Sequence, residues 1–130
     1  MSPVSGTPAA ESALAARHFA SLLEFETDCW DVNASMTAGD QDFVLLDVRG
    51  RGAWDAGHID GAVFHPHPEL TEERLADYPA DTLFVVYCAG PHCNGADKAA
   101  LRLAALGRPV KKMIGGATGW LDEGFDLVPG

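Results

Sequence analysis

Continuous runs of apolar residues indicate the strands that this chain is expected to bury. Segments 43–48 (FVLLDV) and 83–87 (LFVVY) are almost entirely apolar, and 62–64 is a shorter run of the same kind. Such runs are typical of strands covered on both faces of a sheet. Residues 110–114 are a further strand candidate, and the alternating pattern of 24–27 predicts a short edge strand.

Apolar residues spaced three and four positions apart predict the helices. The pattern is strongest in residues 95–106, where alanines and leucines share one face. Residues 14–23 show the same spacing. Two brief helices are expected over 31–36 and 71–77, because each begins with a residue whose side chain can cap a helix.

The order of these elements predicts an α/β fold. Strands alternate with helices through short connections, which favours a mainly parallel sheet with helices against it. A chain of 130 residues is expected to form one domain. We expect residues 1–12, which are small and polar, to be a disordered tail before a single domain over 13–130.

Composition and charge narrow the function. The net charge of −10 would repel phosphate backbones and anionic membrane surfaces, so we expect neither nucleic acid nor a membrane as a partner. The sequence shows no stretch of about 20 apolar residues and no secretory signal. Three cysteines are an odd number, which argues against a disulfide framework. We therefore expect a cytoplasmic protein with reduced thiols.

The candidate active loop joins the strand at 83–87 to the helix at 95–106. Parallel sheets bind ligands beyond the carboxyl ends of their strands, and Cys88 is the first residue after such a strand. We predict that Cys88 is the catalytic nucleophile. The rest of the loop consists of Ala89, Gly90, Pro91, His92, Cys93, Asn94 and Gly95.

The loop can lower the pKa of a thiol through backbone dipoles. Gly90 and Gly95 let the backbone curl, Pro91 fixes one bend, and Asn94 suits the N-cap of the next helix. The unpaired N–H groups at that helix start would favour a thiolate or a bound extra sulfur atom. The loop holds neither lysine nor arginine, which leaves His92 as its only ionisable candidate besides the cysteines.

Four motifs along the chain resemble the rhodanese family, over roughly residues 40–126. They are DVR at 47–49, GHIDGAVFHP at 57–66, VVYC at 85–88 and GGATGW at 115–120. The resemblance implies a three-layer fold with a five-stranded, mainly parallel sheet flanked by helices. Residues 13–39, which precede it, are expected to form a helical extension. The resemblance also implies that Cys88 carries sulfane sulfur as a persulfide, without a cofactor, and that Asp47, Arg49 and His58 support the site.

The active loop departs from the common rhodanese pattern. It begins Cys-Ala-Gly-Pro-His-Cys-Asn, so that Cys93 occupies the place often held by an arginine. This departure argues against thiosulfate as the donor. The YCxGPxCNGA form of the loop resembles a bacterial single-domain subgroup of the family. Cys93 has three readings: a resolving thiol for Cys88, a residue facing the substrate, or a residue turned into the core.

Four functions follow from these residues. The first is a sulfurtransferase that passes sulfur from a small donor to cyanide, a small thiol or a protein thiol. A phosphatase of the same fold is rejected, because it would need an arginine where Asn94 stands. A redox switch of Cys88 with Cys93 and a non-catalytic binding module remain open. The spacing of His58, His65 and His67 does not match that of structural zinc sites, so no metal is expected.

Overall fold

The computed structural model describes residues 1–130 and contains one five-stranded sheet. The strand order is β1-β5-β4-β2-β3, and every neighbouring pair is parallel. The elements in chain order are α1 (Ser12–Phe25), β1 (Glu26–Asp28), α2 (Cys29–Thr37), β2 (Val44–Asp47), α3 (Arg51–Ala56), β3 (Val63–Phe64), the 3-10 helix η1 (His67–Glu69), β4 (Phe84–Tyr87), α4 (Gly95–Ala105), β5 (Val110–Ile114) and α5 (Gly116–Asp122). The α/β fold with a parallel five-stranded sheet is therefore confirmed.

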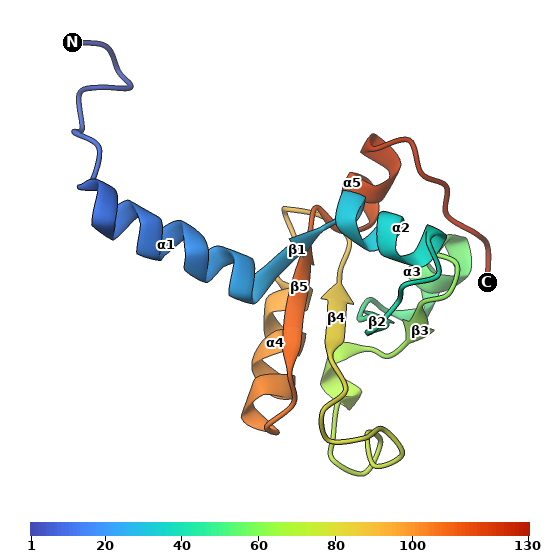
Figure 1. Cartoon of the computed structure of the whole chain (residues 1–130). Helices are drawn as coiled ribbons and strands as arrows, with labels where there is room; N and C mark the ends of the chain where they lie inside the picture. The colour runs from blue at the N-terminus through green and yellow to red at the C-terminus, as the bar shows by residue number, and fades with distance from the viewer.

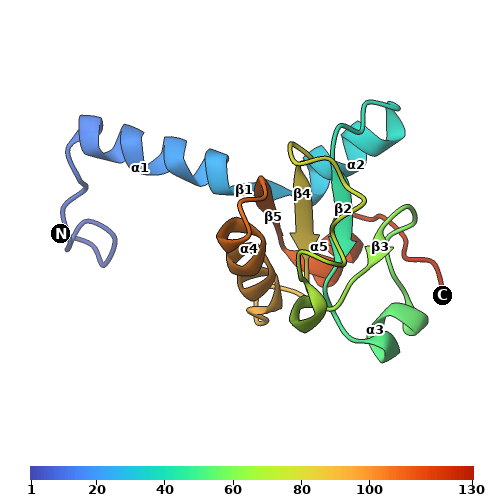
Figure 2. The ribbon, with the colours of Figure 1, turned by 90° about the horizontal axis from the view of Figure 1, so that it is seen from below.

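Helices cover both faces of the sheet, so the fold has three layers (Figures 1 and 2). Strand β4 lies in the centre, and all four of its residues are buried. Its side chains alternate between two core clusters: Phe84, Val86 and the following Cys88 face α4, whereas Val85 and Tyr87 face α2 and α5. This alternation explains why an uninterrupted apolar run forms the strand, because both faces need apolar side chains.

Two of the predicted short helices differ from the structure. Residues 72–77 form successive turns and no helix. The guanidinium of Arg108 binds the carbonyl oxygens of Leu75, Tyr78 and Pro79, which holds the end of this segment in a non-helical path. The helix predicted at 31–36 exists but begins earlier, because the side chain of Asp28 caps it by accepting from the Asp31 amide at 2.8 Å.

Three elements were missed by the sequence pattern. They are α3, η1 and α5, each of seven residues or fewer, and too short to show a full helical period. The most consequential is α5, since its first turn contacts the loop that carries Cys88.

Helix α1 projects away from the sheet (Figures 1 and 2), and none of its residues is buried. Residues 1–11 contain no helix or strand, and their disorder stays a prediction. None of the helices combines the length and the apolar character needed to cross a membrane.

Candidate active site

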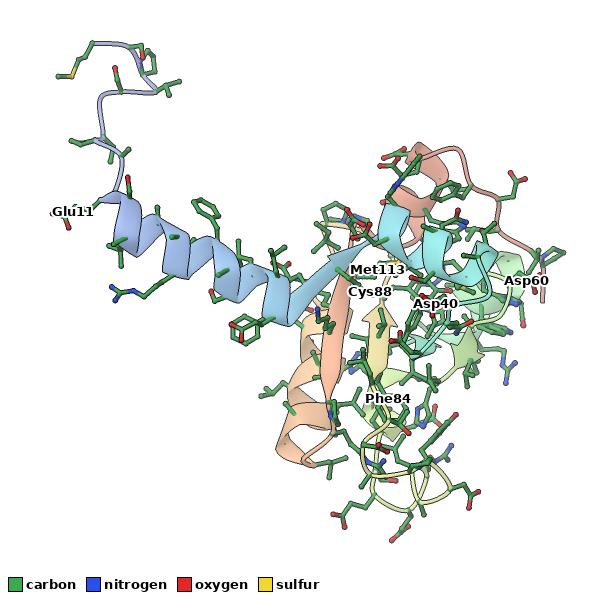
Figure 3. The ribbon with its side chains drawn as sticks, viewed as in Figure 1. Glu11, Asp40, Asp60, Phe84, Cys88 and Met113 are labelled. Atoms are coloured by element: carbon green, nitrogen blue, oxygen red, sulfur yellow. A yellow bond between two sulfur atoms is a disulfide. The ribbon has the colours of Figure 1, made fainter.

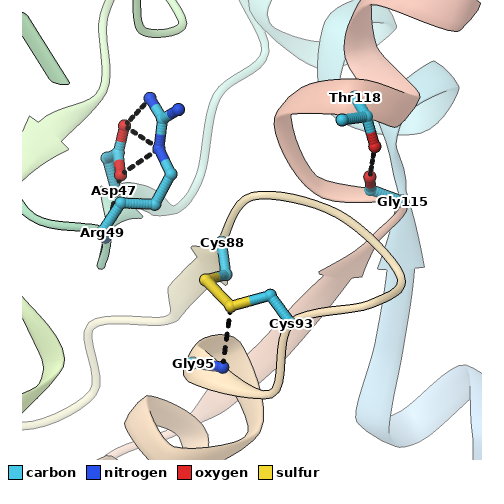
Figure 4. Close-up of a disulfide and its surroundings, with 7 residues drawn as sticks. All are labelled: Asp47, Arg49, Cys88, Cys93, Gly95, Gly115 and Thr118. Atoms are coloured by element: carbon cyan, nitrogen blue, oxygen red, sulfur yellow. Dashed lines mark hydrogen bonds and ion pairs between the residues drawn. A yellow bond between two sulfur atoms is a disulfide. The ribbon is translucent and has the colours of Figure 1, made fainter. Parts of the chain in front are cut away.

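Cys88 lies at the carboxyl end of the central strand β4, directly after Tyr87. Figure 3 shows it beside Met113 of β5, with Phe84 at the opposite end of β4. The residue is only 7% exposed. Its Sγ atom is bonded to Sγ of Cys93, with the two Cα atoms 6.5 Å apart (Figure 4). The structure thus brings together the two loop cysteines whose relationship the sequence left open.

Backbone hydrogen bonds hold the loop against the start of α5. The carbonyl oxygens of Cys88 and Ala89 accept from the amides of Ala117 and Thr118, each at 2.9 Å. Within the loop, the amide of Cys93 donates to the carbonyl of Gly90 at 3.0 Å and closes a turn. The GGATGW motif therefore positions the first residues of the candidate loop.

Glycine is needed at position 95 because the backbone there lies against the sulfur atoms. A Cβ atom on Gly95 would lie 2.6 Å from Sγ of Cys88, closer than ordinary packing allows. The amide of Gly95 donates to Sγ of Cys93 at 3.4 Å (Figure 4). The start of α4 thus contacts both members of the sulfur pair.

Most backbone amides of the loop have no acceptor within the protein. Those of Cys88, Ala89, Gly90, His92 and Asn94 donate no hydrogen bond, unlike those of Cys93 and Gly95. The sequence placed the donors for an anionic sulfur at the start of α4 instead, where the Gly95 amide donates to Sγ of Cys93.

Asn94 occupies the N-cap position of α4, as the sequence predicted. Asn94 precedes α4, but its side chain makes no capping hydrogen bond. Its backbone, at φ −98° and ψ 14°, lies outside the extended region that a capping side chain requires. His92 is exposed to solvent and has no hydrogen-bond partner on its ring.

Asp47 and Arg49 form a buried ion pair behind the loop. Arg49 Nη2 lies 2.7 Å from Asp47 Oδ2, and Arg49 also donates to the carbonyl of Gly57 at 2.7 Å. The hydroxyl of Tyr87 donates to Asp47 Oδ2 at 2.7 Å and accepts from the Ile59 amide at 3.1 Å. Burial and the nearby Asp47 carboxylate raise the pKa of Tyr87, which keeps the hydroxyl protonated as a donor.

This network does not hydrogen-bond to either loop cysteine, but its Arg49 lines one of the two cavities at these cysteines. His58 lies away from the loop cysteines. Its ring stacks on Trp54, with centroids 3.5 Å apart, and its backbone bridges to Val128 near the carboxyl terminus. Neither cavity at the cysteines includes His58 in its lining.

Two cavities meet at the sulfur pair. The larger, of about 590 Å³, lies between the loop, β5 and α5, and the smaller, of about 480 Å³, lies between the loop, α3 and η1. Cys88 and Cys93 line both. The charged residues lining the larger cavity are Asp28, Asp97, Glu123 and Lys112.

The larger cavity has a negative electrostatic character. Its single lysine, Lys112, is 2.9 Å from Asp97 and 3.7 Å from Glu26, so two carboxylates offset its charge. Cys29 also lines this cavity; burial, followed by the nearby Asp28 and Glu123 carboxylates, raises the pKa of its thiol to about 11. The surroundings therefore disfavour additional negative charge.

His67 lines the smaller cavity with Cys88 and Cys93, although the sequence pointed to it only as a metal-ligand candidate. Its Nδ1 atom is buried without a hydrogen-bond partner, and burial lowers the pKa of the ring. In the sequence, only the proline on each side of His67 could have indicated that this residue has a special position. No group of three or more histidine, cysteine or acidic side chains is arranged to hold a metal ion.

Known structures share this architecture. A protein of Bacillus halodurans is 33% identical to the chain and superimposes with a TM-score of 0.86, covering 90% of this chain and 85% of that one. The rhodanese-like domain of an Anabaena protein is 26% identical to this chain and superimposes with a TM-score of 0.71. The match covers 80% of this chain and 78% of the Anabaena chain.

A curated relative comes from Mycobacterium tuberculosis and is named an HTH-type transcriptional regulator. It is 37% identical over 86 residues, which cover 66% of this chain and 38% of the regulator. The chain therefore matches well under half of the length of that relative. Residues 29–123 match the family described as "Rhodanese-like domain", and this range includes every element from α2 to α5 but neither α1 nor β1. The chain thus belongs to the rhodanese-like domain family.

Proposed function

We propose that this protein is a sulfurtransferase that carries sulfane sulfur as a persulfide on Cys88. The Cys88 thiolate attacks the sulfane sulfur of a donor, and the donor leaves as its thiol or anion. A thiophilic acceptor, such as cyanide, a small thiol or a protein cysteine, then removes the outer sulfur and regenerates the thiolate. The reaction needs no metal or organic cofactor, and it requires the reduced cysteines of a compartment such as the cytoplasm.

The observation that carries this proposal is the position of Cys88 among unpaired backbone amides at the end of β4. Those amides can stabilise a thiolate or persulfide anion without a basic side chain. The two adjoining cavities give a donor and an acceptor access to the same sulfur. Family membership supports the same chemistry.

The charges of the larger cavity favour a donor that is not a dianion. The carboxylates of Asp28, Asp97 and Glu123 line the larger cavity, and Lys112 is already paired. Thiosulfate carries two negative charges and would be repelled. A low-molecular-weight persulfide fits this field better.

Steady-state turnover tests the proposal. The protein is incubated with a low-molecular-weight persulfide, 3-mercaptopyruvate or thiosulfate, and thiocyanate formation from cyanide is measured above the uncatalysed rate. We expect turnover with the persulfide, and loss of turnover in Cys88→Ser. The Cys29→Ala variant is the matched control, since it removes a buried thiol with a raised pKa and should still turn over. Equal rates for Cys88→Ser and the wild type would refute the proposal.

A thiol redox switch is the second candidate, and the bond between Cys88 and Cys93 favours it. In this reading an oxidant closes the disulfide and a thiol reductant opens it, without any sulfur being transferred. Peroxide would then form the disulfide, while no donor would support thiocyanate production. If neither reaction occurs, a non-catalytic binding role is the remaining reading.

A further inference from the structure

We propose that Cys93 attacks the Cys88 persulfide, releases hydrosulfide and leaves the Cys88–Cys93 disulfide. This inference rests on the proposed function, since it needs sulfur to reach Cys88 first. It makes Cys93 a second reacting cysteine, through which the sulfane sulfur carried by Cys88 leaves as hydrosulfide.

The geometry gives Cys93 access to Cys88. The loop turn closed by the Cys93 amide and the Gly90 carbonyl brings the Cα atoms to 6.5 Å, within the range that a disulfide spans. The Cys88 and Ala89 carbonyls are held on α5, so this half of the loop is fixed. The amide of Gly95 donates to Sγ of Cys93, and such a donor stabilises a thiolate at that atom.

The step balances without an external oxidant. The Cys93 thiolate supplies an electron pair to Sγ of Cys88, and a new bond forms between the two Sγ atoms. The bond between Sγ of Cys88 and the outer sulfur breaks, and its electron pair leaves with the protonated outer sulfur as hydrosulfide. The sulfane sulfur is reduced and the two cysteine sulfurs are oxidised. A dithiol reductant then returns both cysteines to thiols.

The surroundings also suit the leaving group. Both cavities reach Cys88, so hydrosulfide can depart without the loop opening. The unpaired amides of Ala89, Gly90 and Asn94 are donors available to a sulfur anion in the loop. Gly95 leaves room beside Sγ of Cys88, where any Cβ would collide.

Because of this step, Cys93 and an external acceptor compete for reaction with the Cys88 persulfide. An external acceptor that reaches the outer sulfur first takes it as sulfane sulfur, and otherwise Cys93 clears the site as hydrosulfide. In the absence of an external acceptor, the fully reduced protein therefore accepts one sulfur and then stops as a disulfide until a dithiol reduces it.

A single-turnover experiment tests the inference. Reduced protein, freed of reductant, is mixed with one equivalent of a low-molecular-weight alkyl persulfide, and hydrosulfide, intact mass and the cysteine-containing peptides are measured. The wild type should release close to one hydrosulfide per protein and lose two hydrogens as the Cys88–Cys93 disulfide forms. Cys93→Ser should keep the added sulfur on Cys88 and release hydrosulfide about tenfold more slowly or worse. Cys93→Ala is run in parallel, so that the result does not depend on one substitution.

The outcomes separate the inference from the function on which it rests. If the wild type retains sulfur on Cys88 just as Cys93→Ser does, the inference is overturned and the sulfurtransferase proposal stands. Sulfur found on Cys93 would also overturn it, since Cys93 would then attack the outer sulfur. If Cys93→Ser never gains sulfur on Cys88, the proposed function fails and the inference fails with it.

Discussion

The backbone carbonyl of Cys88 accepts a hydrogen bond of 2.9 Å from the amide of Ala117. This bond joins the candidate nucleophile to the first turn of α5, two motifs that are far apart in the sequence. Gly116 makes the approach possible, since its φ of +60° is unfavourable for other residues and a Cβ there would collide with the Cys88 carbonyl.

Replacing Gly116 with alanine should displace the loop and slow the reaction of Cys88. We expect Gly116→Ala to lower the rate of Cys88 alkylation in the reduced protein by about tenfold, as misplacement of a reacting group does. Gly124→Ala is the matched control, because Gly124 also has a positive φ of 87° but has open space around it. Both variants should lose about 1 kcal/mol of stability from the backbone alone. Equal alkylation rates in the two variants would contradict this role for Gly116.

Gly95→Ala should act directly on the sulfur pair. The new methyl group would lie 2.6 Å from Sγ of Cys88, so the thiol must move away from its present position. We expect slower sulfur uptake with little change in the length of α4, as followed by single-turnover mass spectrometry and circular dichroism. Gly52→Ala, within α3 and with no atom nearby, should leave sulfur uptake unchanged. Wild-type uptake by Gly95→Ala would show that the contact is unimportant.

Tyr87→Phe should destabilise the fold through the buried Asp47. Its hydroxyl donates to the fully buried Asp47 carboxylate and accepts from the Ile59 amide, so both partners would lose a hydrogen bond. We expect a loss of about 1–3 kcal/mol in the free energy of unfolding, measured with urea. Tyr78→Phe, at a half-buried ring packed on Phe84, should change it much less. A similar loss in the free energy of unfolding for both variants would contradict a stabilising role of the hydrogen bonds made by Tyr87.

The charge of Glu123 should set the preference for donors. Glu123 lines the larger cavity, and Glu123→Lys should raise kcat/KM for thiosulfate by roughly fivefold, the equivalent of about 1 kcal/mol between nearby exposed charges. The gain should shrink at high salt. Glu72→Lys makes the same change in net charge at an exposed turn outside this cavity, and should leave the preference as it is. A gain of the same size in both variants would mean that net charge alone matters.

Cys29 should make stability fall at alkaline pH. Burial raises the pKa of its thiol from 9.0 to about 11, so folding disfavours the thiolate. This contribution is fully present below pH 9.0 and is lost as the pH rises through 11, by about 3 kcal/mol in all. Cys29→Ala should be less stable at pH 8 because of lost packing, but its stability should fall less steeply between pH 9 and 11. If the stability of Cys29→Ala and that of the wild type fell equally steeply between pH 9 and 11, the raised pKa of Cys29 would be contradicted.

The sequence pattern predicted the elements that bury long apolar faces. Strand β4 and helix α4 carry enough apolar residues to show their own period, and both were located to within a residue or two. The short helices α3 and α5 were missed, because six or seven residues do not complete a distinct pattern. The helix predicted at 71–77 failed because the contact with Arg108, distant in sequence, overrides local preference.

The site was predictable only in part for a similar reason. Placing Cys88 at the end of a buried strand follows from general properties of parallel sheets. The approach of Cys93, the support from Ala117 and the presence of His67 in the cavity depend on how distant segments fold together. The spacing of residues along the chain does not specify such contacts.

The most direct test of the central claim is to follow one sulfur atom through Cys88. Cys93→Ser is loaded with an isotopically labelled alkyl persulfide, the peptides are mapped, and the loaded protein is then treated with cyanide. We predict that the label appears on Cys88 and leaves as labelled thiocyanate. A label that never reaches Cys88, or that stays on it after cyanide treatment, would contradict sulfur transfer through this residue.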